Sequence, residues 1–241
     1  MNTTWIIAKK ELRTFFDSLI AYILLVVFLG FSGFFTWLFG SDIFLVGQAT
    51  LQPFFSIAYW TLFFFIPALT MRMIAEEKRS GTIELLLTKS VTDWQVVVGK
   101  FIACLSLILI ALALTIPYYI TIWAIGPIDH GAVWSGYLGM ILMSMTFISI
   151  GLFASSITTN QIVAFLLSLF IGIFFLIIFD VLANNFTGAA GQILSFLSLS
   201  THYESISRGV IDSKDLIYFL SITFFGVLLA EISLSKRNIV E

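Results

Sequence analysis

Six apolar stretches, each close to twenty residues long, constrain this sequence more than any other feature. They are Leu19–Phe39, Phe54–Met71, Phe101–Ile125, Val133–Ala154, Ile162–Ala183 and Leu216–Leu234. A helix needs about 20 apolar residues to cross the hydrocarbon core of a bilayer. Because a helix satisfies its own backbone hydrogen bonds in lipid, the pattern predicts an all-α integral membrane protein with six transmembrane helices.

Composition supports the same class of protein. Hydrophobic residues make up 59% of the chain and charged residues 11%, against roughly 45–50% and 25% in soluble domains. We therefore expect a single transmembrane domain over residues 1–241, surrounded by membrane lipid. The lone cysteine, Cys104, excludes an intrachain disulfide and a cysteine-rich metal site, so no metal is expected. A net charge of -2 provides no basic field for nucleic acid, which is not expected as a partner.

Lys and Arg residues are unevenly distributed between the segments that join the spans. Because these residues concentrate on the cytoplasmic side of membrane proteins, their positions predict the orientation. Ten of the twelve lie before the first span, between the second and third, or after the sixth: Lys9, Lys10, Arg13, Arg72, Lys78, Arg79, Lys89, Lys100, Lys236 and Arg237. The other segments hold only Arg208 and Lys214. Both termini are therefore predicted to face the cytoplasm.

The predicted cytoplasmic segment 72–100 combines the densest charge cluster of the chain with a compact apolar patch. Ser80-Gly81 indicates a helix stop, since glycine adopts the left-handed conformation that many C-terminal caps need. Thr82 is placed to cap a second, short helix, and Glu84 in its first turn complements the helix dipole. The charge cluster and the patch thus belong to two successive helices.

The short helix leaves an apolar surface that needs cover. Thr92 and Gln95 form a capping-box pattern that starts the next helix, so the segment reads as helix, short helix, helix. An exposed patch on the middle helix is costly unless something covers it. Its members are Ile83, Leu85, Leu86 and Leu87. Docking into another protein and burial in the lipid headgroups both remain open.

The predicted outer segment 184–214 contains an apolar tract, Gly188–Leu199, that is too short to span the membrane. A tract of this length favours a short re-entrant or interfacial helix, and a lid that packs on the bundle is the alternative. His202, Glu204 and Arg208 follow it. They are a candidate outer gate for a substrate, with an ordinary capped turn as the alternative.

Three stretches resemble one protein family. AEEKRSGTIELLLTKSVTDWQVVVGKF, residues 75–101, resembles the cytoplasmic-loop motif of ABC-2 type permeases, with its Glu-Glu pair, Gly-Thr, Glu-Leu-Leu run and later Gly-Lys. KKELRTFFDSLIAYI, residues 9–23, is similar to the amphipathic elbow helix of that family. HYESISRGVIDSKDLIYFLSI, residues 202–222, resembles one branch of these permeases. Together the resemblance covers nearly the whole chain and is nearest to the GldF-type permeases of gliding motility.

The resemblance implies a function and a set of partners. It implies a permease subunit of an ATP-binding cassette transporter, an exporter in the inner (cytoplasmic) membrane. A separate ATPase subunit would dock on the coupling helix, and a second permease subunit, identical or related, would complete the assembly. An accessory motility or secretion protein is a further expected partner. The implied ATPase-coupling residues are Glu76, Glu77, Arg79, Gly81, Thr82, Ile83, Glu84, Leu85, Leu86 and Leu87.

ATP hydrolysis is expected in the partner subunit and not in this chain. The Gly99-Lys100 pair lacks the upstream glycine and the following hydroxyl of a phosphate-binding loop. The chain is therefore expected to be no enzyme and to hold no cofactor, with ATP and Mg²⁺ bound by the ATPase.

Two other functions are alternatives. A gradient-driven secondary transporter often uses ionisable groups inside the membrane, and Asp180 and Glu231 lie near span ends, where they more simply reach the interface. A rhomboid-like serine protease would use Ser32 of a G-x-S-G string. Its serine needs a base within hydrogen-bond reach, but His130 and His202 both lie outside the apolar spans.

Overall fold

The predicted fold class is confirmed. A computed structural model describes residues 3–38, 48–82 and 91–235, and the regular elements in these ranges are helices. Six helical segments are long and apolar enough to cross a membrane: Leu19–Trp37, Gln52–Arg79, Asp93–Ile125, His130–Ser156, Gln161–Asn185 and Ser213–Ser235. The second continues beyond the predicted span, and the third begins before it, because helix persists into the charged segment between them.

Thirteen helices make up the described part of the chain. They are α1 (Thr3–Asp17), α2 (Leu19–Trp37), α4 (Gln52–Thr70), α5 (Ala75–Arg79), α7 (Asp93–Ala113), α8 (Ile116–Ile125), α9 (His130–Ser156), α10 (Gln161–Ile173), the π-helix η1 (Phe174–Ile178), α11 (Phe179–Asn185), α12 (Ala189–Leu197), α13 (Leu199–Ser207) and α14 (Ser213–Ser235).

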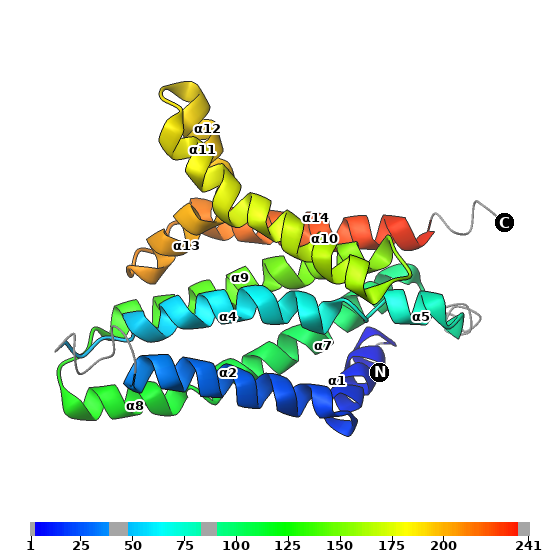
Figure 1. Cartoon of the computed structure of the whole chain (residues 1–241), viewed down its shortest axis with the longest axis horizontal. Helices are drawn as coiled ribbons and strands as arrows, with labels where there is room; N and C mark the ends of the chain where they lie inside the picture. The colour runs from blue at the N-terminus through cyan, green and yellow to red at the C-terminus, as the bar shows by residue number, and fades with distance from the viewer. Residues whose placement is uncertain (1–2, 39–47, 83–90, 236–241) are drawn as a thin grey trace.

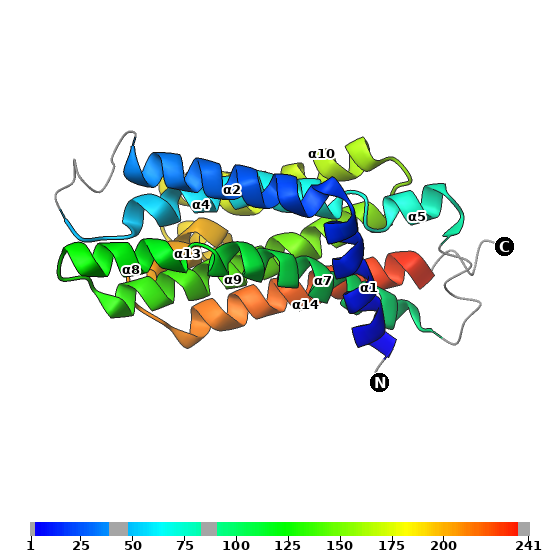
Figure 2. The same ribbon diagram turned by 90° about the horizontal axis from the view of Figure 1, so that it is seen from below.

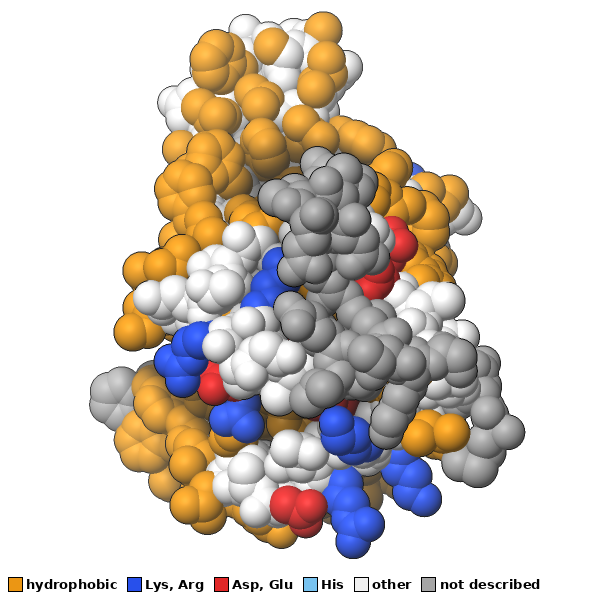
Figure 3. Space-filling model, turned by 90° about the vertical axis from the view of Figure 1, so that its right-hand side faces the viewer, with side chains coloured by type: hydrophobic (Ala, Val, Ile, Leu, Met, Phe, Trp, Pro, Cys, Tyr) orange, Lys and Arg blue, Asp and Glu red, His pale blue; other side chains and the backbone are white. Residues whose placement is uncertain are grey.

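The long helices lie side by side along one axis, so that the molecule has two ends (Figure 1). α1, α5 and the last turns of α14 lie at one end, and α8 lies at the other (Figure 1). Figure 3 looks onto the first end, where Lys and Arg side chains gather. We call it the basic end; its described basic residues are Lys9, Lys10, Arg13, Arg72, Lys78, Arg79 and Lys100.

Helix α9 is the centre of the bundle. It packs against α4, α7, α10, α13 and α14. Within its apolar 18-residue stretch, 78% of the residues are buried. Small residues allow these close approaches. A Cβ atom added at Gly151 of α9 would overlap the side chain of Thr70 of α4, and one at Gly226 of α14 would meet Ser149 of α9.

Helix α1 lies across the long helices and packs on α7 (Figure 2). Its buried residues Ile7, Ala8 and Phe15 recur at helical spacing, whereas Lys9 and Lys10 are exposed. The chain breaks at Ser18 before α2 begins. The stretch predicted as an elbow is therefore a two-faced helix that turns into the first span; the family role of that helix stays a prediction.

The fifth span is the least enclosed. α10 continues through η1 into α11, and α11 and α12 stand away from the bundle (Figure 1). Within the apolar 18-residue stretch of this span, only 22% of the residues are buried. Helix α12, from the predicted outer tract, packs mainly on α11, whereas α13 returns to α9. The lid alternative therefore fits α13 better than the tract itself, and the position of α12 in a bilayer stays a prediction.

The local signals around the charged segment are confirmed where the structure describes them. Helix α5 ends at Arg79, and Gly81 has a φ of 68°, which favours glycine. The Thr92 hydroxyl accepts from the Gln95 N–H, and the Gln95 side chain accepts from the Thr92 N–H, both at 3.3 Å. The predicted middle helix falls on residues 83–90 and lies outside the described residues.

Candidate functional site: the basic end and an aromatic pocket

Lys100 joins three helices at the basic end. Its side chain is 1% exposed, and its Nζ lies 2.8 Å from Glu77 Oε1 of α5 and 3.5 Å from Glu11 Oε1 of α1. A buried ammonium group is unfavourable unless it is paired, and the two carboxylates supply its partners. The Glu11–Lys100–Glu77 triad therefore ties α1 and α5 to α7, the helix that follows residues 83–90 in the chain.

Helix α5 is also fastened to the end of α9. The Ser155 hydroxyl accepts from the backbone N–H groups of Ile74 and Ala75 at 3.1 and 3.0 Å. It donates in turn to the carbonyl of Met71 at 2.9 Å. These N–H groups at the start of α5 have no helical acceptor of their own, so Ser155 takes the place of a capping residue.

Three predicted coupling residues lie on α5, in different surroundings. Glu77 is partly buried and pairs with Lys100. Glu76 accepts from the Gln161 side chain at the start of α10 and lies 3.3 Å from Arg79 Nη2. Arg79 itself remains largely exposed. The two carboxylates thus connect α5 to the bundle, and the guanidinium faces outward.

The other predicted coupling residues follow α5. Gly81 provides the left-handed turn, and the Thr82 hydroxyl lies 2.9 Å from that of Ser80. Both are exposed. The remaining residues, Ile83, Glu84, Leu85, Leu86 and Leu87, lie outside the described residues, so their role stays a prediction.

Neither Lys100 nor Glu11 was predicted from the sequence to take part in a buried ion pair. The sequence does contain a signal for this ion pair, because both residues lie on apolar helix faces. Glu11 falls on the buried face of α1 between Ala8 and Phe15, and Lys100 falls among the buried residues of α7. A charge on the apolar face of a helix needs a partner from another element.

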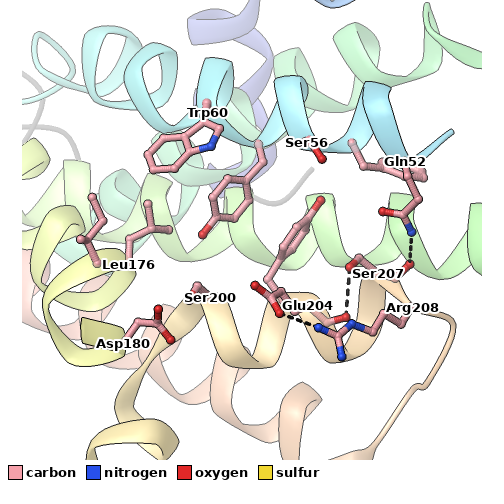
Figure 4. Close-up of a pocket in the computed structure, with 13 residues that line it drawn as sticks. Gln52, Ser56, Trp60, Leu176, Asp180, Ser200, Glu204, Ser207 and Arg208 are labelled. Carbon is pink, nitrogen blue, oxygen red and sulfur yellow. Dashed lines mark hydrogen bonds and ion pairs between the residues drawn. The ribbon is translucent and has the colours of Figure 1, made fainter. Parts of the chain in front are cut away.

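A second feature is a cavity of about 740 Å³ between α4, η1, α11 and α13, which we call the aromatic pocket. Figure 4 shows Trp60 on the α4 side, with Asp180 and Glu204 on the side formed by α11 and α13. Its lining residues are Gln52, Phe55, Ser56, Tyr59, Trp60, Leu176, Ile177, Asp180, Ser200, Tyr203, Glu204, Ser207 and Arg208.

Two buried tyrosines line this pocket. The rings of Tyr59 and Tyr203 lie 4.6 Å apart between centroids. The Tyr203 hydroxyl donates to Met140 Sδ at 3.1 Å, and burial raises the pKa of Tyr203, so the phenol stays protonated. The Tyr59 hydroxyl is buried and has no hydrogen-bond partner among the described residues.

The predicted gate residues separate into two places. Glu204 and Arg208 line the aromatic pocket and pair at 2.8 Å (Figure 4). His202 does not line it. Its Nδ1 lies 2.6 Å from Asp215 Oδ1 of α14, and its Nε2 lies 2.9 Å from the Phe196 carbonyl of α12.

His202 holds α12, α13 and α14 together. A carbonyl only accepts hydrogen bonds, so Nε2 carries a proton, and a second proton lies between Nδ1 and Asp215. The ring also stacks on Tyr218 of α14 at 4.0 Å. His202 is therefore a structural link behind the pocket, and Glu204 and Arg208 are the two of the three that face the cavity.

The described residues lack the arrangement of a serine protease. The Ser32 hydroxyl donates to the Leu29 carbonyl of its own helix at 3.4 Å. His130 Nδ1 lies 2.7 Å from the hydroxyl of Tyr119, and His202 is held by Asp215. Neither imidazole bonds to Ser32, so the base that this chemistry needs is not in place.

The family comparison defines the class of this protein. The family model described as ABC-2 family transporter protein matches residues 5–235. The chain therefore belongs to this family and is the membrane subunit of an ABC transporter.

Among curated proteins, the chain is similar to the "Probable multidrug ABC transporter permease YbhR" of Escherichia coli strain K12 and to the protein of the same name from strain O157:H7. Each is 26% identical over 147 residues, which is 58% of this chain and 38% of the relative. The match thus spans well under half the length of those relatives.

Proposed function

We propose that this chain is the permease subunit of an ATP-driven exporter and receives its driving motion at the basic end. The observation that carries the proposal is the Glu11–Lys100–Glu77 triad, which links the segment before residues 83–90 to α1 and α7. Family membership and the multidrug permease named among its relatives support the same reading. Family membership also favours an ATP-driven mechanism over the gradient-driven alternative.

The mechanism is conformational. The ATPase docks on residues 76–87, and closure of the ATPase on ATP pushes on this segment. Because α5 is fastened to α1 and α7 through Lys100 and to α9 through Ser155, the push moves several spans together. Such rigid-body motions switch packed helices between discrete arrangements. ATP and Mg²⁺ belong to the ATPase.

The assembly proposed here contains a second permease subunit, identical or related. The open face of the fifth span, of which little is buried within one chain, offers a place for it. The basic end faces the cytoplasm in an inner membrane, in agreement with the charge distribution. The resemblance of the chain to GldF-type permeases further suggests a gliding-motility transporter with an accessory motility or secretion protein.

Co-purification tests the proposal. The tagged chain is purified from its native membrane in mild detergent, with Leu86→Asp as the variant and Val210→Asp as the matched control. Val210 is exposed in the segment between α13 and α14, far along the chain from residues 76–87. We expect a P-loop ATPase to accompany the wild type and the control and to be lost with Leu86→Asp, because a charge in an apolar interface is costly.

Two results would contradict the proposal. If crosslinking in intact membranes captures no ATPase with the wild-type chain, ATP-driven transport is wrong and a gradient-driven transporter becomes the better reading. If Leu86→Asp and Val210→Asp retain the ATPase equally, the ATPase does not dock on the apolar patch that contains Leu86.

A further inference from the structure

The aromatic pocket contains a carboxylate without a counter-charge. Asp180 is partly buried and belongs to the fifth membrane-spanning segment, Gln161–Asn185. No described residue forms an ion pair with it, whereas Glu204 pairs with Arg208. The two carboxylates and one guanidinium of the pocket leave one negative charge unbalanced. A partly buried carboxylate that lines a cavity without a counter-charge is costly unless something compensates it, so Asp180 is a candidate contact for a bound cation.

The walls around Asp180 suit an organic cation. Trp60 and Phe55 from α4 and Tyr203 from α13 present aromatic rings to the cavity. The face of an aromatic ring attracts a cation, most strongly when the cation is partly desolvated. The described lining does not suit an anion, because its one basic residue, Arg208, is already paired with Glu204.

A second, independent observation points to a ligand. Tyr59 is 7% exposed and lines the pocket, yet its hydroxyl has no partner among the described residues. Buried polar groups are nearly always hydrogen-bonded, so an exception calls for an explanation. A polar group bound in the cavity would accept a hydrogen bond from this hydroxyl, and an ammonium N–H would donate one to it.

The backbone next to Asp180 is also unusual. The π-helix η1 precedes it, and Leu176 and Ile177 of η1 line the pocket with Asp180. Single π-turns within α-helices occur frequently at functional sites. The cavity of about 740 Å³ falls within the range of roughly 300–1,000 Å³ that is typical of small-molecule sites.

We propose that the aromatic pocket binds a lipophilic organic cation, with Asp180 as its counter-charge and Trp60 and Tyr59 as its aromatic and hydrogen-bonding contacts. The identification of this ligand as a transported substrate rests on the proposed function, whereas the binding itself does not. Glu204 and Arg208 form the rim of the site, consistent with their exposure.

The test uses two probes of the same shape and opposite charge. The full-length protein is reconstituted in lipid nanodiscs, and equilibrium binding of tetraphenylphosphonium and of tetraphenylborate is measured against empty nanodiscs. We expect saturable binding of the phosphonium only. Asp180→Asn should weaken it by about tenfold or more, the order of loss for removing a charged partner, and Asp180→Glu should largely retain it. Asp212→Asn, which removes a half-exposed carboxylate that does not line the pocket, should leave affinity unchanged.

Several outcomes would overturn this proposal. They are equal binding of both probes, binding of neither, or unchanged phosphonium affinity in Asp180→Asn. If Asp180→Asn fails to fold, the comparison of the two probes on the wild-type protein still decides. Phosphonium binding by a chain that recruits no ATPase would refute the proposed function alone, and an ATPase complex that binds no phosphonium would refute the pocket alone.

Discussion

Lys100 and Asp180 are two charged residues in apolar helices that differ in whether an ion-pair partner compensates the charge. Lys100 is enclosed and has two carboxylate partners from two other helices. Asp180 lines a cavity and has no ion-pair partner among the described residues. Because a buried charge is stable only when it is compensated, the first residue contributes to the fold and the second is available to a ligand.

Removing the ammonium group of Lys100 should destabilise the protein. Lys100→Met keeps most of the side-chain volume but leaves Glu77 and Glu11, both mostly buried, without a counter-charge. Breaking such a pair costs about 3 kcal/mol. We expect a clearly lower unfolding midpoint in detergent, measured by intrinsic fluorescence.

Lys10→Met is the control for this experiment, because Lys10 is exposed on α1 and surface changes usually stay within about 0.5 kcal/mol. A double-mutant cycle with Glu77→Gln isolates the pair: if the ion pair is real, the double variant costs less than the sum of the single variants. Strict additivity would mean that Lys100 acts through packing alone.

At the level of elements, apolar length and capping patterns predicted the fold well. The six spans and the Thr92–Gln95 capping box depend on local sequence, and both are confirmed. The aromatic pocket was not predicted, because its walls come from α4, η1, α11 and α13, which only tertiary packing brings together. The same reason separates His202 from Glu204: neighbours on one short helix face different elements.

The contact between α4 and α9 should be more sensitive to added volume than the surface of α2. A Cβ at Gly151 would overlap Thr70, whereas a Cβ at Gly30 would meet nothing within 4 Å. Overpacking a close contact costs about 1–3 kcal/mol, but alanine is otherwise the better helix former. Gly151→Ala should therefore lower the unfolding midpoint, and Gly30→Ala should leave it unchanged or raise it.

Thermal unfolding of the two purified variants, side by side with the wild type, checks this prediction. Equal stability of Gly151→Ala and Gly30→Ala would show that α4 and α9 can separate at little cost. In that case the small residues of α9 would not explain its central position in the bundle.

Over the whole molecule, the helices are held together by polar contacts at the basic end and are loosely packed around the fifth span. The basic end is cross-linked by the Lys100 triad and by Ser155, whereas the fifth span stays largely open and α11 and α12 stand away from the bundle (Figure 1). The aromatic pocket lies where this open span meets α4 and α13. Under the proposed coupling, a push at the basic end would reach the pocket through α4, which continues toward α5, and through α9, which contacts α13.

This arrangement gives a prediction for the whole chain in its membrane. If the basic end faces the cytoplasm, Thr14 on α1 and Val210, which follows α13, lie on opposite sides of the bilayer; both are exposed, and Cys104 is buried. A membrane-impermeant maleimide should label Val210→Cys in intact spheroplasts and Thr14→Cys only after lysis. The Cys104 background is measured on the wild type. The reverse pattern would place the ten basic residues outside, against the tendency of Lys and Arg to stay on the cytoplasmic side. It would also place the proposed ATPase contact outside the cell and so contradict it.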